Sequence, residues 1–292
     1  MTLDGALLLD KPVGISSNRA LQQAKQLFGA AKAGHAGTLD PLASGLLIVL
    51  FGEATKFAGY LLEDDKEYLA TLRLGEKTAT GDAEGEVIER KAVQVSQSDL
   101  FRVLQSFKGE IEQVPPMHSA LKRDGVPLYA LARKGETVAR EARRVRIAEL
   151  ERVEFSPPQL VLRVRCSKGT YVRTLAEDIG EALGTCAHLT ALRRTASGRW
   201  RVEDAVSLEN LGSRNLLPLS ALLADLPRAE LDAAQEARFR NGQSLESFPG
   251  EGVRAVYGAR GTVIGLGQAT PGGTLRPLRL VAQAADKHQK TL

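Results

Sequence analysis

Apolar and polar positions in the first two hundred residues follow two periods, which predicts a mixture of strands and helices. Continuous apolar runs over residues 5–9 and 45–51, each ended by polar or turn-forming residues, are typical of buried strands. Apolar positions recur every three or four residues over 19–28. This spacing predicts an amphipathic helix, with Ser17 or Asn18 as the expected N-cap.

Further elements predict the fold class. The remaining predicted elements are a strand over 67–74, a helix over 98–107, a hairpin of strands 144–155 and 159–166, a helix over 171–183 and a strand or helical piece over 187–195. Strands and helices mix without a regular strand–helix–strand order, and no repeat of about 20 to 50 residues occurs. We therefore expect an α+β fold with a mixed, largely antiparallel sheet.

The pattern of predicted elements changes near residue 226. We expect a first domain over residues 1–226. Beyond it, short strand-like pieces separated by glycine-rich turns indicate a small β-barrel-like domain over 227–285. Residues 286–292 are polar and are expected to form a flexible tail.

Composition narrows the class of protein. The 292 residues are 43% hydrophobic and 25% charged, which is near the globular average and excludes disorder for most of the chain. No apolar run approaches the roughly 20 residues that a membrane helix needs, and no secretory signal is expected. Two cysteines are too few for a disulfide framework and lack zinc-site spacing. A reduced, cytoplasmic protein without membrane contact is predicted.

Basic residues are concentrated in one stretch. The net charge is only +4, but residues 140–173 hold eight arginines and one lysine against four glutamates. Such a stretch is either a solvated surface that contains many ion pairs or a surface that binds a polyanionic partner. The preference for arginine favours phosphate, because a planar guanidinium can donate two parallel hydrogen bonds to it.

The loop before strand 45–51 offers the clearest candidate chemistry. Gly34 and Gly37 allow close backbone approach, and a proline follows Asp40 and biases it toward an extended conformation. An aspartate on such a rigid loop is a candidate nucleophile or base. The alternative is an Asx turn, in which the carboxylate only accepts hydrogen bonds from nearby backbone amides. For His35 the alternative is also structural: a loop histidine whose ring nitrogens have hydrogen-bond partners within the protein.

A second cluster follows strand 159–166. Ser167-Lys168-Gly169-Thr170 leads into a helix that carries Tyr171 and Arg173 in its first turn. The free N–H groups of a helix start, together with Lys168 and Arg173, suit a phosphate. Alternatively, Arg173 pairs with a buried acid and would hold Asp40 ionised.

Several other kinds of site have no motif in the chain. The spacings of a phosphate loop, a dinucleotide fingerprint, a zinc-protease helix and a hydrolase nucleophile elbow do not occur. The four histidines are scattered, and only Cys186-Ala187-His188 resembles a pair of metal ligands, which is too few for a metal site. An enzyme built on this chain is expected to work without metal or cofactor, with a carboxylate as its leading group.

The segment Gly34-His35-Ala36-Gly37-Thr38-Leu39-Asp40-Pro41-Leu42-Ala43-Ser44-Gly45 resembles the catalytic motif of the TruB-type tRNA pseudouridine synthases. Ala36 and Thr38 exchange the Thr and Ala often seen at these two positions, which a backbone-defined loop should tolerate. Further segments that resemble the family, in chain order, are Leu8–Gly14, Gly52–Lys56, Asp65–Tyr68, Thr80–Gly85, Gln113–Lys122, Ser167–Arg173 and Leu192–Arg194. They cover most of residues 5–210, and the C-terminal piece is similar to a PUA domain.

The resemblance implies isomerisation of uridine 55 in the T-loop of tRNA to pseudouridine, by base flipping and cleavage and re-formation of the glycosidic bond. No cofactor is implied. Asp40 matches the nucleophile, which attacks the ribose or the base ring, although a route through a glycal stays open. Tyr68 matches the aromatic residue that stacks on the flipped base and moves a proton. Arg173 matches the arginine paired with the catalytic aspartate.

The same resemblance implies binding and supporting residues. His35 matches the residue that enters the space vacated in the RNA, Leu192 an apolar wall of the pocket, and Tyr171 and Lys168 a substrate-binding segment. The residues expected to support the active-site loop are Lys11, Pro12, Gly34 and Gly37. Residues 123–142 resemble the family's mobile insertion that closes on RNA. The implied partner is tRNA, through its T-arm and T-loop, and a monomer with no obligate protein partner is expected.

Two other functions stay open at this point. An RNA-binding or RNA-folding protein would need the basic stretch and the PUA-like end, but not the set Asp40, Tyr68 and Arg173. A glycosidase with two carboxylates would need a second acid near Asp40. Candidates for that second acid, none singled out by the sequence, are Asp10, Glu53, Asp64, Asp65 and Asp82.

Overall fold

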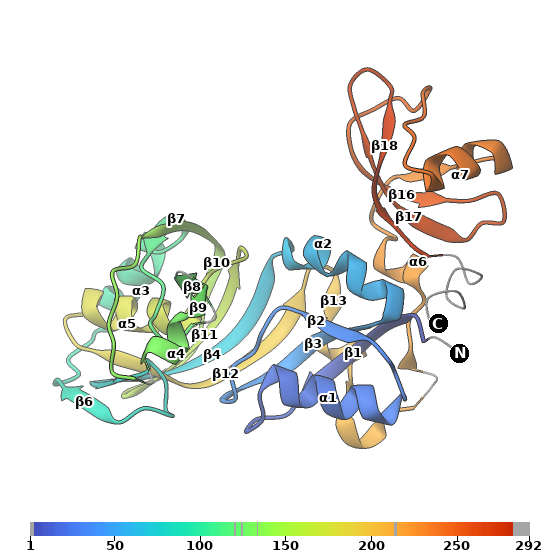
Figure 1. The fold of residues 1–292 in the computed structure, drawn as a ribbon. Helices are drawn as coiled ribbons and strands as arrows, with labels where there is room; N and C mark the ends of the chain where they lie inside the picture. The colour runs from blue at the N-terminus through green and yellow to red at the C-terminus, as the bar shows by residue number, and fades with distance from the viewer. Residues whose placement is uncertain (1–2, 120, 124, 133, 213–214, 283–292) are drawn as a thin grey trace.

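The computed structural model describes residues 3–119, 121–123, 125–132, 134–212 and 215–282, so the expected tail 286–292 lies outside it. One large mixed sheet organises the described residues (Figure 1). Its strands lie in the order β14 (Val206–Ser207), β1 (Gly5–Lys11), β3 (Ala43–Phe51), β12 (Ala187–Ser197), β4 (Lys66–Leu74), β11 (Gln159–Cys166), β10 (Arg143–Ser156) and β7 (Gly109–Gln113). Strand β2 (Ala33–Ala36) pairs with β3, and β13 (Trp200–Arg201) pairs with β12. Of the pairs described, β1–β14 and β3–β12 are parallel and the others antiparallel, which confirms the predicted α+β class and mixed sheet.

Strands β1 and β3 are buried on both faces, which explains their uninterrupted apolar sequences. Successive side chains of a strand point to opposite faces. Leu7 therefore packs with helix α1 (Ser17–Leu27) on one side of the sheet. Leu8 packs with η1 (Gly52–Phe57) and α2 (Ala58–Leu62) on the other.

The other half of the large sheet has its own helical cover. Helices α3 (Gln97–Ser106) and α5 (Val172–Ala182) pack on β4, β10 and β11, around fully buried side chains such as Ile147 and Leu162. The smaller elements are β5 (Glu76–Thr78), β6 (Val87–Arg90), β8 (Lys122–Arg123), β9 (Val126–Pro127), α4 (Leu128–Ala132), η2 (Val202–Asp204), η3 (Leu208–Asn210) and α6 (Leu219–Leu222). Elements β8, β9 and α4 lie in or beside the stretch 123–142.

Two local predictions need correction, and a third, which left strand or helix open, is resolved. Helix α1 begins at Ser17 and its N-cap is Ser16, whose side chain accepts the N–H of Arg19, because the Ser17 side chain turns inward instead. Part of the loop expected before Pro41 is strand β2, which pairs with β3. The piece 187–195 is a strand, because β12 is held between β3 and β4 by backbone pairing on both sides.

The C-terminal residues form a separate small sheet. Its strands lie in the order β15 (Arg228–Glu230), β16 (Gly252–Tyr257), β17 (Val263–Ala269) and β18 (Leu275–Leu280). Helix α7 (Ala233–Arg240) packs on it through the fully buried Phe239. In the described residues this sheet is open, so the predicted barrel is not closed there.

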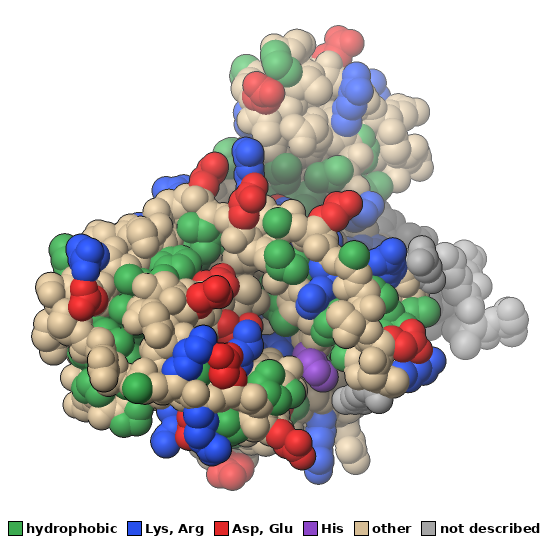
Figure 2. Space-filling model, turned by 90° about the vertical axis from the view of Figure 1, so that its left-hand side faces the viewer, with side chains coloured by type: hydrophobic (Ala, Val, Ile, Leu, Met, Phe, Trp, Pro, Cys, Tyr) green, Lys and Arg blue, Asp and Glu red, His purple; other side chains and the backbone are tan. Residues whose placement is uncertain are grey.

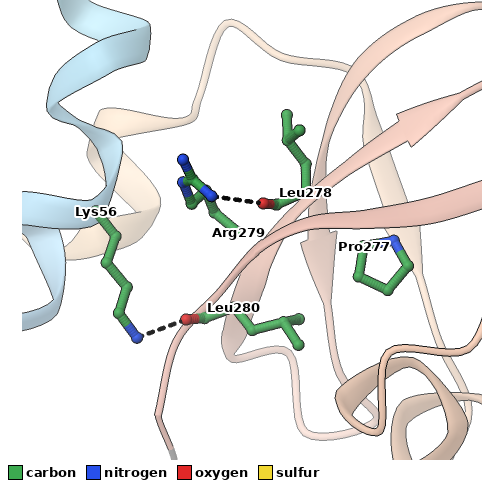
Figure 3. Close-up of a pocket in the computed structure, with 5 residues that line it drawn as sticks. All are labelled: Lys56, Pro277, Leu278, Arg279 and Leu280. Atoms are coloured by element: carbon green, nitrogen blue, oxygen red, sulfur yellow. Dashed lines mark hydrogen bonds between the residues drawn. The ribbon is translucent and has the colours of Figure 1, made fainter.

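The small sheet is joined to the large one by apolar and polar contacts. Tyr257 and Leu266 share a buried cluster with Leu222 of the first body. Lys56 Nζ donates to the Leu280 carbonyl at 2.7 Å, at the edge of a pocket of about 300 Å³ (Figure 3). No helix among the described residues is long and apolar enough to cross a membrane.

Candidate active site

The loop that carries Asp40 is fixed to the start of helix α1. The buried Ser17 hydroxyl accepts the N–H of Leu39 at 2.7 Å and donates to the Leu39 carbonyl at 2.9 Å. On the other side of Asp40, the Pro41 carbonyl accepts the N–H of Gly14 at 2.8 Å. Asp40 thus stands between two anchored residues, while its side chain is 43% exposed. A fixed backbone with an accessible carboxylate suits a nucleophile or base better than a purely structural turn.

Arg173 lies beside this carboxylate. Its Nη2 is 3.0 Å from Asp40 Oδ2, and its side chain is only 9% exposed. The same guanidinium donates to the Thr80 carbonyl at 3.0 Å and the His118 carbonyl at 2.7 Å. Because its donors are used inside the protein, Arg173 forms the ion pair that was one of its two predicted roles, rather than a free phosphate site.

A second carboxylate shares the guanidinium. Asp82 Oδ2 is 3.7 Å from Arg173 Nη1, and the Asp82 side chain is 4% exposed. Its Oδ1 accepts the Thr80 hydroxyl at 2.5 Å and the backbone N–H of Glu84 at 3.1 Å. A buried acid engaged in this way is poorly placed to protonate a leaving group, so Asp82 does not suit the second acid of a glycosidase.

Tyr68 lies on β4 directly opposite Arg194 of β12. Burial raises the pKa of the Tyr68 hydroxyl, and the Arg194 guanidinium, which hydrogen-bonds with it, lowers that pKa in part. The resting side chain is therefore a neutral phenol. The phenol is also close enough to Asp40 for the two groups to interact electrostatically.

Lys11 and His35 border the same site. Lys11 is fully buried and its Nζ donates to the carbonyls of Pro12 at 2.8 Å and Ile15 at 2.7 Å. Burial lowers the pKa of Lys11 to about 8, against the opposite effect of Asp40. Burial, and then Arg194, lower the pKa of His35, whose Nδ1 is buried with no hydrogen-bond partner among the described residues. His35 is therefore neutral at pH 7.

Three family models match this chain, one after another. The N-terminal domain of TruB family pseudouridylate synthase matches residues 25–172, the tRNA pseudouridylate synthase B C-terminal domain 173–224, and the pseudouridine synthase II TruB C-terminal domain 227–281. The tRNA pseudouridine synthase B of Burkholderia mallei (strain NCTC 10247) is 54% identical over 97% of this chain and 98% of its own. That of Thiobacillus denitrificans (strain ATCC 25259 / T1) is 52% identical over 96% of each.

The chain belongs to the TruB family of pseudouridine synthases. It is therefore an enzyme, a tRNA pseudouridine synthase, and an isomerase of tRNA processing. A solved structure of an H/ACA RNP bound to a substrate RNA containing 2′-deoxyuridine has a chain with the same fold, with a TM-score of 0.72 at 24% identity. That match covers 96% of this chain and 85% of the other.

The structure gives the other residues predicted from the TruB resemblance partners outside the ion pair. Tyr171 is the N-cap of α5, and its N–H donates to the buried Gln113 side chain at 3.1 Å. Leu192 packs on the cluster under α5 and is in register with Ala43, three residues after Asp40. Lys168 is exposed and forms an ion pair with Glu63 instead of reaching Asp40.

The two predicted glycines of the TruB motif differ. Gly37 has a φ of +90°, a conformation that strains other residues. Gly34 has no such φ, and a methyl group there would meet only Thr55, at an ordinary 3.7 Å. The structure therefore explains a glycine at position 37 but not at position 34.

The basic stretch shows the first of its two predicted readings, a surface with ion pairs. On β10 and β11, Arg163 pairs with Glu151 at 3.4 Å and Arg165 with Glu149 at 3.2 Å. Figure 2 shows acidic and basic side chains interspersed on this side of the molecule. The positive charge available to RNA is therefore smaller than the count of arginines suggests.

Sequence reasoning missed three supports of this TruB site. Ser17 was considered only as a cap. Asp82 was named as a possible glycosidase acid and, like Arg194, as part of a matching segment. The family-like segments containing Asp82 and Arg194 were the available signal, but nothing in the sequence indicated their partners. Among the described residues, no group of three or more His, Cys, Asp or Glu side chains could hold a metal ion.

Proposed function

We propose that this chain converts uridine 55 of the tRNA T-loop to pseudouridine, without a cofactor. The observation that carries the proposal is the 3.0 Å ion pair between Arg173 and the half-exposed Asp40, which joins two segments that match TruB family models. The isomerisation breaks the N1–C1′ bond and forms a C5–C1′ bond, with no net oxidation or reduction. A carboxylate and proton-transfer groups are sufficient for such chemistry.

Asp40 acts at the ribose. As a nucleophile its carboxylate bonds to C1′ while the N1–C1′ electron pair leaves with the uracil, and C5 of the turned base then displaces the carboxylate. In the alternative route, the carboxylate removes the proton on C2′ and a glycal forms. Both routes need an ionised, oriented carboxylate, which Arg173 and the anchored loop supply.

The uridine must leave its stack in the loop to reach Asp40. We assign Tyr68 the stacking contact with the flipped base and a part in proton transfer, because its phenol lies near Asp40. The half-buried His35 enters the vacated space in the RNA. Leu192 forms an apolar wall, while Tyr171 and Lys168 contact the substrate. Lys11 and Pro12 support the loop.

The domain plan follows from the same proposal. Residues 1–226 form the catalytic domain, and the stretch 123–142 closes on the T-arm. Residues 227–285 form a PUA-like domain that adds RNA contacts. The enzyme acts on tRNA as a cytoplasmic monomer.

The test uses unmodified T-arm RNA, no added metal or cofactor, and mapping of pseudouridine at single-nucleotide resolution. The wild-type chain is expected to convert one uridine, and Asp40→Asn to abolish turnover while RNA affinity stays nearly unchanged, because phosphate contacts dominate binding. Asp204→Asn, an exposed site on η2, is the matched control and keeps full activity. Random or absent conversion by the wild type, with RNA binding intact, would favour an RNA-binding protein instead.

A further inference from the structure

Arg194 is a buried cation that the steps above do not use. It lies on β12 with 1% of its surface exposed. Its Nε donates to the Leu46 carbonyl at 2.6 Å and its Nη2 to the Gly37 carbonyl at 3.2 Å. A charge held at this depth by neutral carbonyls is costly to bury. Its position therefore calls for a reason beyond packing.

Two glycines of the TruB motif make room for Arg194, Gly37 for its guanidinium and Gly45 for its backbone. A methyl group on Gly37 would lie 3.2 Å from Arg194 Nη1, and one on Gly45 only 2.3 Å from the Arg194 carbonyl oxygen. Arg194 is in register with Gly45 on β3 and with Tyr68 on β4. The two carbonyl contacts fix the direction of the guanidinium, and the strand register places Tyr68 beside it.

The charge of Arg194 changes the pKa values of nearby groups, and the direction of each change shows which ionised form it stabilises. Arg194 lowers the pKa of Tyr68 by charge and by a hydrogen bond, whereas burial, Cys166 and Asp40 raise it. The other titratable groups that it affects, on β1, β2 and β4, are Lys11, His35 and Lys66. These three are bases, and each is held further toward its neutral form by this charge. Tyr68 is the group in this set whose ionised form Arg194 stabilises.

We propose that Arg194 is a positioning residue of the isomerisation that acts through Tyr68, orienting its hydroxyl and stabilising its phenolate. The inference rests on the proposed function. In the step concerned, the phenolate takes the proton from C5 after the C5–C1′ bond has formed. The C5–H electron pair becomes the C5–C6 double bond, the C6–N1 π pair moves to N1, and N1 takes a proton from water. Tyr68 then returns its proton to water.

The first experiment measures the phenol without any reaction. The full chain is labelled with 3-fluorotyrosine, the Tyr68 resonance is assigned with Tyr68→Phe, and its titration is followed by ¹⁹F NMR. Arg194→Gln is expected to move the Tyr68 titration to higher pH, and Arg194→Lys to move it less. Arg193→Gln, which removes the neighbouring arginine and its ion pair with Asp10, is the matched control and leaves the titration in place. An unmoved Tyr68 titration in both Arg194 variants overturns the proposal.

The second experiment measures single turnovers on T-arm RNA at saturating enzyme. Arg194→Gln should lower the rate about 100-fold, as loss of one fixed donor at a developing charge does, with RNA affinity unchanged and the rising limb of the pH profile moved to higher pH. In a Tyr68→Phe background, Arg194→Gln should cost little further, because the two residues act as one unit. Equal losses in both backgrounds overturn the proposal and leave Arg194 a structural role. If the wild type forms no pseudouridine, the proposed function fails, while the NMR experiment still decides whether Arg194 acts on Tyr68.

Discussion

Replacing Ser17 with alanine should weaken both the fold and the reaction, because one buried hydroxyl holds the residue before Asp40. The Ser17 hydroxyl satisfies both the N–H and the carbonyl of Leu39, at 2.7 and 2.9 Å. Alanine favours the helix at least as well as serine. The substitution therefore removes the two hydrogen bonds and leaves α1 otherwise intact.

The magnitude follows from the two backbone groups left without a partner. Each buried unsatisfied group costs about 1 to 3 kcal/mol, so with two such groups the free energy of unfolding should fall by about 2 to 6 kcal/mol. In a protein of this size, each kcal/mol lowers Tm by about 2 to 4 °C, which gives a decrease of about 4 to 24 °C. Because a displacement of about 1 Å can cost about 100-fold in rate, we expect the single-turnover rate to fall about 10- to 100-fold.

Thermal unfolding and single-turnover conversion of T-arm RNA check this prediction. The matched control is Ser16→Ala, because Ser16 is exposed and only caps α1 through the Arg19 N–H at 3.2 Å. Loss of that cap should cost about 1 kcal/mol and leave the rate unchanged. If Ser17→Ala has the Tm and rate of Ser16→Ala, the Leu39 anchor does not position Asp40.

Two further predictions concern ions and protons. RNA affinity should fall at least about tenfold between 50 and 200 mM salt, because each neutralised phosphate releases counterions; a titration that gives the same Kd at both concentrations would reject phosphate recognition by the basic stretch. The folded-state pKa of Lys11 is lowered from 10.5 to about 8, so between these values the unfolded chain binds more protons than the folded one and the free energy of unfolding rises with pH. Denaturant unfolding from pH 8 to 10.5 should therefore show the wild type gaining stability relative to Lys11→Met, and a constant difference would contradict the buried amine.

The sequence-based predictions were best where burial alone determines the element. Strand 45–51 and the hairpin of 144–155 and 159–166 are found as β3, β10 and β11, because their apolar patterns match sheet faces that the helices cover. The piece 187–195 was ambiguous, since its apolar positions fit a strand or a helix. Its pairing with β3 and β4, which are distant in the chain, decides for a strand.

The site was predictable only in part, for a related reason. Asp40, Tyr68 and Arg173 were named from their resemblance to a family, and the structure pairs Asp40 with Arg173 at 3.0 Å. The contacts that hold them, such as Ser17 with Leu39 or Arg173 with the Thr80 carbonyl, join polar groups far apart in the chain. A buried hydrogen bond of this kind leaves no periodic pattern, so only the folded arrangement identifies its partner.

Strand β12 explains why the site forms where it does. It pairs in parallel with β3 and antiparallel with β4, and so joins the half of the sheet under α1 to the half under α5 (Figure 1). The Asp40 loop enters β3, Tyr68 belongs to β4, and Arg173 lies at the start of α5. Each half supplies part of the site. The seam between the halves, which is β12 with its pairing to β3 and β4, is held by that backbone pairing and by the buried Arg194. Disturbing that seam should therefore separate the carboxylate from the phenol before either half unfolds, which makes activity a more sensitive readout of the seam than Tm.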